Sequence, residues 1–291
     1  MRARVWYNAV MESVRVKSYA KLNLTLHITG MESGYHNLDS IVTTVDMYDA
    51  ITVKKRKDNL VSVTMRGMGS ESIPFENNNA ANAAQLFVEK YQTRGADIKI
   101  DKNIPLGLGV GGSSADAAGV LNALFTLYKI DDEIGKKLLA DECGSDTRYM
   151  LSGGYARLFK RGNVVKKIDS KLKLNFLLLA PKDGVSTPEC YKLCDSFPAP
   201  AGDSTNAENA IINGDKQELA KHICNGLQPA AQKLCGDIEA AYNELKEFDP
   251  LAVCMTGSGS GVYALFENAE FCRYAKSRYR GKFRTYELKT H

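Results

Sequence analysis

The stretch Ile104-Pro-Leu-Gly-Leu-Gly-Val-Gly-Gly-Ser-Ser-Ala-Asp-Ala-Ala118 combines four closely spaced glycines, two serines and the start of an alanine-rich helical run. Glycine tolerates positive φ and lets the backbone approach a bulky anion closely. In such a loop the N–H groups point inward, and the positive end of the following helix faces the same anion. The stretch therefore predicts a phosphate-binding loop; the alternative is a glycine-rich turn before a buried helix.

The loop differs from two common nucleotide-binding motifs. A P-loop ends in Gly-Lys-Ser/Thr, and no lysine follows these glycines. Gly107, Gly109 and Gly112 satisfy G-x-G-x-x-G, but a dinucleotide-binding fold also needs an acidic residue about twenty positions further on. Residues 122–130 end a predicted helix there instead. The loop therefore indicates phosphate binding of another kind.

Composition excludes several classes of protein. A net charge of +4, from 38 basic and 34 acidic residues, is too small to indicate nucleic-acid binding. No apolar run is long enough to span a bilayer. The seven cysteines are irregularly spaced without C-x-x-C, and the four histidines are scattered. We therefore expect a cytoplasmic protein with free thiols, without a disulfide framework, zinc site or histidine metal cluster.

The periodicity of apolar residues predicts an α+β protein. We expect residues 1–12 to be an extension and place a domain boundary near Leu172, giving a β-rich domain at 13–171 and an α/β domain at 172–291. Predicted strands are 14–27, 41–53, 60–65, 96–100, 154–159, 164–168, 172–179, 252–256, 262–266 and 285–288. Predicted helices are 78–91, 114–128, 131–143, 187–194, 216–222, 227–234 and 235–247, with a surface loop at 196–205.

Three further segments carry candidate site residues. Alternation along a strand places Lys21 and Asn23 on one face, where the lysine could meet a carboxylate or a phosphate or could be an exposed edge residue. Asp146 follows a predicted helix and precedes a strand-like segment, so it could act in the site or be a turn former. A second glycine-rich loop, residues 255–261, could cover the phosphates or be a tight hairpin.

In this order, these pieces resemble the GHMP kinase superfamily, which is named for galactose, homoserine, mevalonate and phosphomevalonate kinases. The match is most similar to members that phosphorylate a cytidine diphosphate-linked alcohol, and it runs from about Val14 to Phe266. The resemblance implies the two-domain GHMP kinase fold, with helices over a β-rich N-terminal sheet and a C-terminal α/β sandwich. The segments that carry it are Ala20–Leu24, Gly34–His36, Pro105–Ala118, Gly144–Asp146, Val185–Tyr191 and Met255–Gly261.

The resemblance also implies roles for individual residues. It implies transfer of the ATP γ-phosphoryl group to a hydroxyl, with Asp146 accepting or orienting the hydroxyl proton and Lys21 pairing with Asp146. Mg²⁺ is implied near Ser113 or Ser114. The implied ATP-binding residues are Asn78, Pro105, Gly107, Gly109, Gly111, Gly112, Ser113 and Ser114. The implied substrate-binding residues are Asn23, Tyr35, His36, Tyr191, Gly257 and Gly259, with the two tyrosines stacking on cytosine.

The sequence departs from the family pattern in three places. Ser113 and Ser114 arrive one position early, residues 225–228 lack two expected carboxylates, and Arg148 stands near the presumed base, where it could stabilise Asp146 or bind a phosphate. Two alternatives therefore stay open: a kinase of another small alcohol, or a catalytically weak nucleotide-binding protein. We expect a monomer or homodimer that acts on a small molecule, without a nucleic-acid or membrane partner.

Overall fold

The computed structural model describes residues 12–291, so most of the predicted N-terminal extension lies outside the described residues. Its larger sheet is built around β3 (Tyr35–Lys55), a strand long enough to pair with β1, β2, β5 and β6 in turn. The other strands of this sheet are β1 (Ser13–Asn23), β2 (Thr25–Glu32), β4 (Val61–Arg66), β5 (Ala96–Asp101), β6 (Tyr155–Lys160), β7 (Val164–Ile168) and β9 (Cys224–Asn225).

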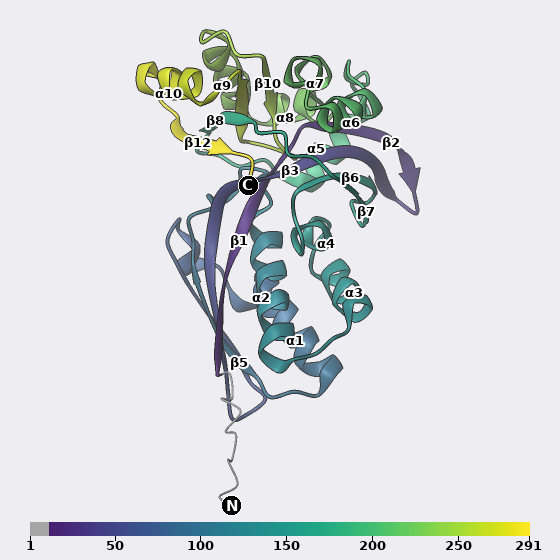
Figure 1. The fold of residues 1–291 in the computed structure, drawn as a ribbon, viewed down its shortest axis with the longest axis vertical. Helices are drawn as coiled ribbons and strands as arrows, with labels where there is room; N and C mark the ends of the chain where they lie inside the picture. Colours follow the sequence, from purple (N-terminus) through teal and green to yellow (C-terminus); the bar gives the residue numbers. More distant parts are fainter. Residues whose placement is uncertain (1–11) are drawn as a thin grey trace, which may run out of the picture.

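Helices cover one face of this sheet (Figure 1). They are α1 (Asn79–Tyr91), α2 (Gly112–Tyr128), α3 (Glu133–Cys143) and α4 (Thr147–Met150), preceded by short 3₁₀ turns at Ser70–Ser72 and Phe75–Asn77. Ile51 and Ile100 of the sheet pack against Phe87 of α1 and Leu121 of α2, all fully buried. α2 is rich in alanine, which lets it lie close to the strands, so the preceding glycine loop is held at a fixed place above the sheet.

A second sheet, in the order β10-β11-β8-β12, forms the other part of the molecule (Figure 1). Its strands are β8 (Asn175–Ala180), β10 (Ala252–Met255), β11 (Val262–Phe266) and β12 (Arg284–Lys289). The helices of this part are α5 (Thr187–Cys194), α6 (Ser204–Asn213), α7 (Lys216–His222), α8 (Gln228–Leu234), α9 (Asp237–Lys246) and α10 (Ala269–Arg278). The two parts are joined where β9 pairs in parallel with β2.

The α+β class and the β-rich first part are confirmed, but the local predictions failed at three helices. Asp146 precedes the short helix α4, where a strand was expected. Residues 204 and 205 begin α6, because the Asp203 carboxylate accepts hydrogen bonds from the N–H groups of Thr205 and Asn206. Helix α10 was not predicted at all. The domain division at Leu172 stays a prediction.

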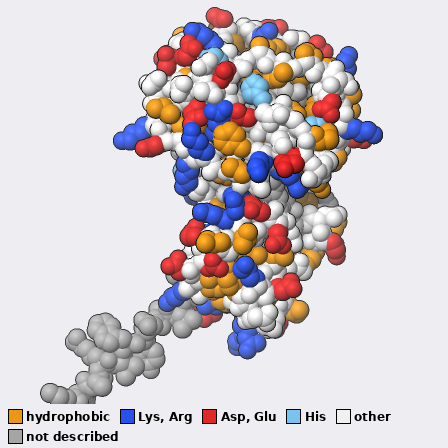
Figure 2. Space-filling view, turned by 90° about the vertical axis from the view of Figure 1, so that its right-hand side faces the viewer, with side chains coloured by type: hydrophobic (Ala, Val, Ile, Leu, Met, Phe, Trp, Pro, Cys, Tyr) orange, Lys and Arg blue, Asp and Glu red, His pale blue; other side chains and the backbone are white. Residues whose placement is uncertain are grey.

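On the face shown in Figure 2, Lys and Arg side chains are interspersed with Asp and Glu and form no continuous basic stripe. Within residues 12–291, no helix has both the length and the apolar character needed to cross a membrane. All seven cysteines are free thiols.

Candidate active site

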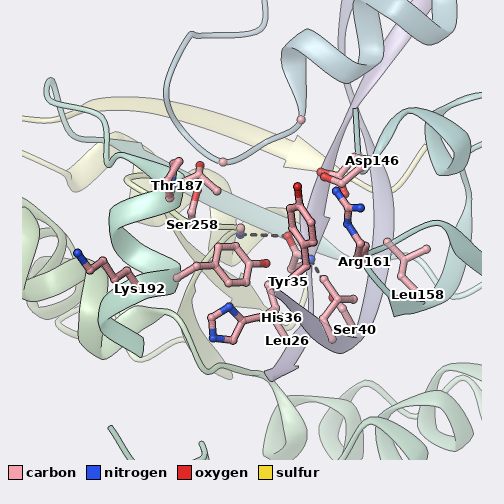
Figure 3. A pocket seen from close by; sticks show the side chains of 18 of the residues that line it. Leu26, Tyr35, His36, Ser40, Asp146, Leu158, Arg161, Thr187, Lys192 and Ser258 are labelled. Atoms are coloured by element: carbon pink, nitrogen blue, oxygen red, sulfur yellow. Dashed lines mark hydrogen bonds between the residues drawn. The ribbon is translucent and has the colours of Figure 1, made fainter. Parts of the chain in front are cut away.

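A cavity of about 750 Å³ opens where the end of β1, the start of β3, α5 and both glycine-rich loops meet (Figure 3). Its lining draws on segments that are far apart in the sequence. The predicted site residues among the lining are Lys21, Asn23, Tyr35, His36, Gly109, Gly111, Asp146, Tyr191 and Gly257. The fold therefore brings together most of the candidate residues, although their roles stay predictions.

Lys21 and Asp146 form an ion pair at one end of this cavity. Nζ of Lys21 lies 3.4 Å from Oδ2 of Asp146, and it also donates a hydrogen bond to Oδ1 of Asn23. The lysine side chain is 4% exposed, whereas that of Asp146 is 25% exposed. Charges in a site of low exposure attract each other more strongly than they do in water. The pair thus presents a carboxylate to the cavity with a buried ammonium behind it.

The predicted phosphate loop has the backbone that its glycines allow. Gly109 and Gly111 have φ of +70° and +76°. A Cβ at Gly111 would lie 2.4 Å from Cε of Met150 and 3.1 Å from Cγ of Lys21, so the absent side chain leaves room for the lysine stem. α2 begins at Gly112, and Gly111 offers no side-chain cap. The uncapped N–H groups and the helix dipole favour an anion at this point.

The second glycine-rich loop joins β10 to β11, so it is both a hairpin connection and a wall of the site. The N–H of Gly261 donates to the carbonyl of Leu108 at 3.2 Å, which ties the second loop to the first. The N–H of Gly257 donates to Oδ1 of Asn23 at 3.0 Å. Asn225 donates to the carbonyl of Gly257 at 2.8 Å, so this asparagine braces the loop.

Aromatic side chains line the other end of the cavity. The rings of His36 and Tyr191 lie 5.4 Å apart between centroids, and burial raises the pKa of Tyr191. Cζ of Arg161 lies 3.7 Å from the ring centroid of Tyr35, which is half-exposed (Figure 3). Nε2 of His36 lies 3.0 Å from Oδ1 of Asp195. This end offers flat rings, one imidazole and one guanidinium, a set suited to a heteroaromatic base or an anion.

Other predicted residues lie outside the lining of the cavity: Asn78, Pro105, Gly107, Gly112, Ser113, Ser114 and Gly259. Asn78 is the N-cap of α1, and its Oδ1 accepts from the N–H of Ala80 at 2.9 Å. Ser113 is exposed and Ser114 is half-buried, both in the first turn of α2. A Cβ at Gly144 would lie 3.1 Å from Oγ of Ser114, so this hydroxyl is next to the segment that carries Asp146.

Arg148, which the sequence suggested could stabilise Asp146 or bind a phosphate, makes its contacts elsewhere. Its Nε lies 2.9 Å from Oδ1 of Asp141 on α3, and its Nη1 donates to the carbonyl of Asn163 at 3.2 Å. Residues two positions apart on a helix do not face each other. Arg148 therefore points away from Asp146. Its ion pair is with Asp141, so the suggested contact with Asp146 was wrong.

A buried charge cluster lies under the phosphate loop, and the sequence analysis missed it. Nζ of Lys102 lies 2.5 Å from Oδ2 of Asp49 and 2.6 Å from Oδ2 of Asp116, with all three side chains at most 4% exposed. Oδ1 of Asp49 accepts from the N–H of Ile104 at 2.9 Å. Burial, the largest cause, raises the pKa of Asp116 to about 8. The cluster ties β3, the start of the loop and α2 together.

Arg161, Asp195 and the hydrogen-bonded pair Thr187–Ser258 also line the cavity and were missed. Arg161 lies in the turn between β6 and β7, and Asp195 follows α5. Neither Arg161 nor Asp195 belongs to a motif, whereas Thr187 and Ser258 lie within the segments Val185–Tyr191 and Met255–Gly261. In the sequence, the one feature that could have pointed to Arg161 and Asp195 is their charge close to predicted site segments.

Comparison with known proteins identifies the family of this chain. Residues 78–154 match the GHMP kinases N terminal domain, and residues 207–279 match the GHMP kinases C terminal domain. A 4-diphosphocytidyl-2-C-methyl-D-erythritol kinase of Caldicellulosiruptor saccharolyticus is 35% identical over 87% of this chain and 88% of its own. The protein of the same name from Clostridium beijerinckii is 33% identical over 94% of this chain and 99% of its own.

Solved structures give the same result for the fold. The crystal structure of a 4-(cytidine 5′-diphospho)-2C-methyl-D-erythritol kinase matches with a TM-score of 0.78 and 26% identity over 96% of this chain and 100% of that one. The homoserine kinase of Cytophaga hutchinsonii matches with a TM-score of 0.73 at 16% identity over 99% of this chain and 97% of that one, a likeness of fold alone. This chain belongs to the GHMP kinase family, in the group of 4-diphosphocytidyl-2-C-methyl-D-erythritol kinases.

Proposed function

We propose that this chain transfers the γ-phosphoryl group of ATP to the 2-hydroxyl of 4-diphosphocytidyl-2-C-methyl-D-erythritol, in non-mevalonate isoprenoid precursor synthesis. The observation that carries the proposal is the Lys21–Asp146 ion pair in the same cavity as Tyr35, His36 and Tyr191. A reactive carboxylate and a set of rings for a base are both needed for this substrate. The names of the relatives support the same acceptor.

In the proposed reaction Asp146 accepts the proton of the acceptor hydroxyl as its oxygen bonds to the γ-phosphorus. The bond between that phosphorus and the β,γ-bridging oxygen breaks, and ADP leaves with the electron pair. Lys21 steadies the negative charge at Asp146 and at the transferred group. Phosphoryl transfer depends mainly on positioning and electrostatic stabilisation, so one carboxylate and one cation suffice beside a metal ion.

The ATP phosphates would lie on the loop from Gly107 to Ser114, with Asn78 and Pro105 bordering the nucleotide. Oγ of Ser114 lies beside Gly144, and the neighbouring Oγ1 of Thr147 is buried without a hydrogen-bond partner. Hydroxyl oxygens are ligands that Mg²⁺ accepts beside phosphate oxygens and water, so this donor set fits the ion. Ser113 or Ser114 would hold Mg²⁺, which would neutralise phosphate charge.

The cytidine end of the acceptor would lie among the aromatic side chains. Tyr35 and Tyr191 would stack on cytosine, and His36 would hydrogen-bond to its edge. Asn23 and the loop with Gly257 and Gly259 would contact the remainder of the acceptor. Arg161 adds a positive charge on the same side. The free thiols support a reducing cytoplasm as the compartment, while a monomeric or homodimeric state stays a prediction.

The test is an ADP-release assay with the purified chain, ATP and Mg²⁺. We expect ADP formation to depend on 4-diphosphocytidyl-2-C-methyl-D-erythritol, and phosphorus NMR of the product to locate the new phosphate on the 2-hydroxyl. Mevalonate, homoserine and galactose serve as matched alternative acceptors. ADP release that is no faster with the cytidine compound than with these acceptors would contradict the proposal.

A further inference from the structure

A histidine, a cysteine and an aspartate meet beside the aromatic end of the cavity. His36 lies near the start of β3, Cys194 ends α5, and Asp195 follows it. A ring nitrogen of His36, Sγ of Cys194 and a carboxylate oxygen of Asp195 all lie within 4.8 Å of one another. Oδ1 of Asp195 is 3.0 Å from Nε2 of His36 and 3.8 Å from Sγ of Cys194. The fold thus assembles a nitrogen, sulfur and oxygen donor set that the irregular cysteine spacing did not predict.

The donor set indicates which ion it would take. Zn²⁺ binds imidazole nitrogen, thiolate sulfur and carboxylate oxygen with bonds of about 2.0–2.3 Å in a tetrahedron, which places the donors about 3.4 Å apart. The observed separations reach that geometry with shifts of about 1 Å at the side-chain ends. Mg²⁺ selects oxygen ligands and would not compete well for sulfur and imidazole.

We propose that His36, Cys194 and Asp195 form a zinc site, and that the bound ion inhibits the enzyme by competing with the cytidine end of its substrate. Zinc would displace the thiol proton of Cys194 into solvent as the metal–sulfur bond forms. The inhibitory part rests on the proposed function, whereas the zinc site itself does not.

The surroundings of the three side chains support both zinc binding and inhibition by the bound ion. The Asp195 side chain is 57% exposed, and a second cavity of about 340 Å³ reaches His36, Cys194 and Asp195 from the side of Phe197, so an ion has an entry path. Three protein ligands leave the fourth position of a tetrahedron open to water. His36 and Asp195 also line the main cavity. An ion that holds both side chains removes His36 from the substrate.

Metal binding is tested first, on the full chain without an affinity tag, ATP or substrate. Zn²⁺ is titrated in competition with a chromogenic chelator, and Co²⁺ serves as a spectroscopic probe. We expect one tight equivalent of zinc and a thiolate-to-cobalt charge-transfer band. Cys194→Ser should abolish the band and weaken zinc binding at least about 10-fold. Mutating a residue that only supports a metal ligand already costs about this much affinity, and Cys194 would be a ligand itself. Equal affinities, or no band in the unmodified chain, would overturn the site.

Cys224→Ser is the matched control, because Sγ of Cys224 also contacts a histidine, at 3.3 Å from Nε2 of His27. This variant should keep the band and the affinity; loss of the band here would overturn the assignment to Cys194. Thermal unfolding in EDTA checks that Cys194→Ser folds like the unmodified chain. If Cys194→Ser does not fold like the unmodified chain, Cys194→Ala is used in its place. Added zinc should raise the melting temperature only where Cys194 is present.

Inhibition is tested separately, with buffered free Zn²⁺ at saturating Mg²⁺ and ATP. We expect zinc to raise KM for the cytidine substrate without lowering kcat, and Cys194→Ser to keep its basal rate and lose this effect. Zinc that binds but leaves KM unchanged would overturn competition while the binding result stands. A chain that lacks activity on this substrate would contradict the proposed function, and the chelator and cobalt titrations would still decide the zinc site.

Discussion

Nζ of Lys21 lies 3.4 Å from Oδ2 of Asp146 while it donates a hydrogen bond to Oδ1 of Asn23. The ammonium is almost fully buried and the carboxylate opens on the cavity. Asn23 therefore holds the lysine from within the fold, and the ammonium lies behind the carboxylate that opens on the cavity. Because Asp146 is the more exposed member of the pair, it is the one that could take a proton from a group in the cavity.

Asp146→Asn should lower kcat by about two orders of magnitude or more, because an amide cannot accept the hydroxyl proton. KM for ATP should change little. Steady-state kinetics and a thermal melt measure both effects. Asp141→Asn is the matched control, since Asp141 lies on the preceding helix with similar exposure and pairs with Arg148. Normal turnover in Asp146→Asn would show that another group is the base.

Arg148→Ala should leave kcat within about twofold and lower the free energy of unfolding by about 1 kcal/mol, the usual size for a partly exposed ion pair. The reason is that Arg148 contacts Asp141 and the carbonyl of Asn163 and not Asp146. Urea unfolding and initial rates test this together. A fall in kcat comparable with that of Asp146→Asn would mean that Arg148 does act on the site.

The elements and motifs that were predicted are local in sequence. The alternation in β1, the continuous apolar strand β8 and the alanine-rich α2 each follow from neighbouring residues. α10 escaped prediction because charged and polar residues make up much of it: it buries only Cys272 and Ala275 and leaves Phe271 and Tyr274 exposed.

The missed parts of the site depend on contacts between distant segments. Asp195 meets His36 across 159 positions, and Lys102 meets Asp49 across 53. No spacing rule can predict such pairs, since the fold alone brings the segments together. The error at Arg148 has a different origin: proximity in sequence suggested contact with Asp146, but the Arg148 side chain turns to Asp141 on α3 and to the carbonyl of Asn163.

Asp195→Asn should raise KM for the cytidine substrate about 5- to 10-fold, the loss of about one hydrogen bond, with kcat within about twofold. Oδ1 of Asp195 lies 3.0 Å from Nε2 of His36, so this contact orients the ring and would leave Nδ1 for a substrate contact. Glu218→Gln is the control, because Glu218 makes an equivalent 3.0 Å contact with His222 outside the cavity. Unchanged KM in Asp195→Asn would exclude this positioning role.

Asp116→Asn should alter the pH dependence of stability. Burial raises the pKa of Asp116 from the ordinary 3.8 to about 8, so between these values the folded state binds more protons than the unfolded state. The free energy of unfolding contributed by this group therefore falls as pH rises through that window. Asparagine has no proton to lose, so the stability of the unmodified chain minus that of the variant should decrease from pH 5 to pH 8. Urea unfolding at several pH values measures the difference, and a constant value would contradict the assignment.

Gly109→Ala should impair the kinase more than its backbone strain explains. Gly109 has φ of +70°, and an added Cβ would lie 2.1 Å from the carbonyl oxygen of Thr256, so the two glycine loops must separate. Gly214 has φ of +72° with no atom within 4 Å of an added Cβ, which makes Gly214→Ala the matched control.

Both variants should lose about 1 kcal/mol of stability or more from strain. Only Gly109→Ala should also raise KM for ATP or lower kcat, by about tenfold, because the phosphate-binding backbone moves with the loop. Initial rates at varied ATP decide this, and equal kinetics in the two variants would show that contact between the loops has no role in the reaction.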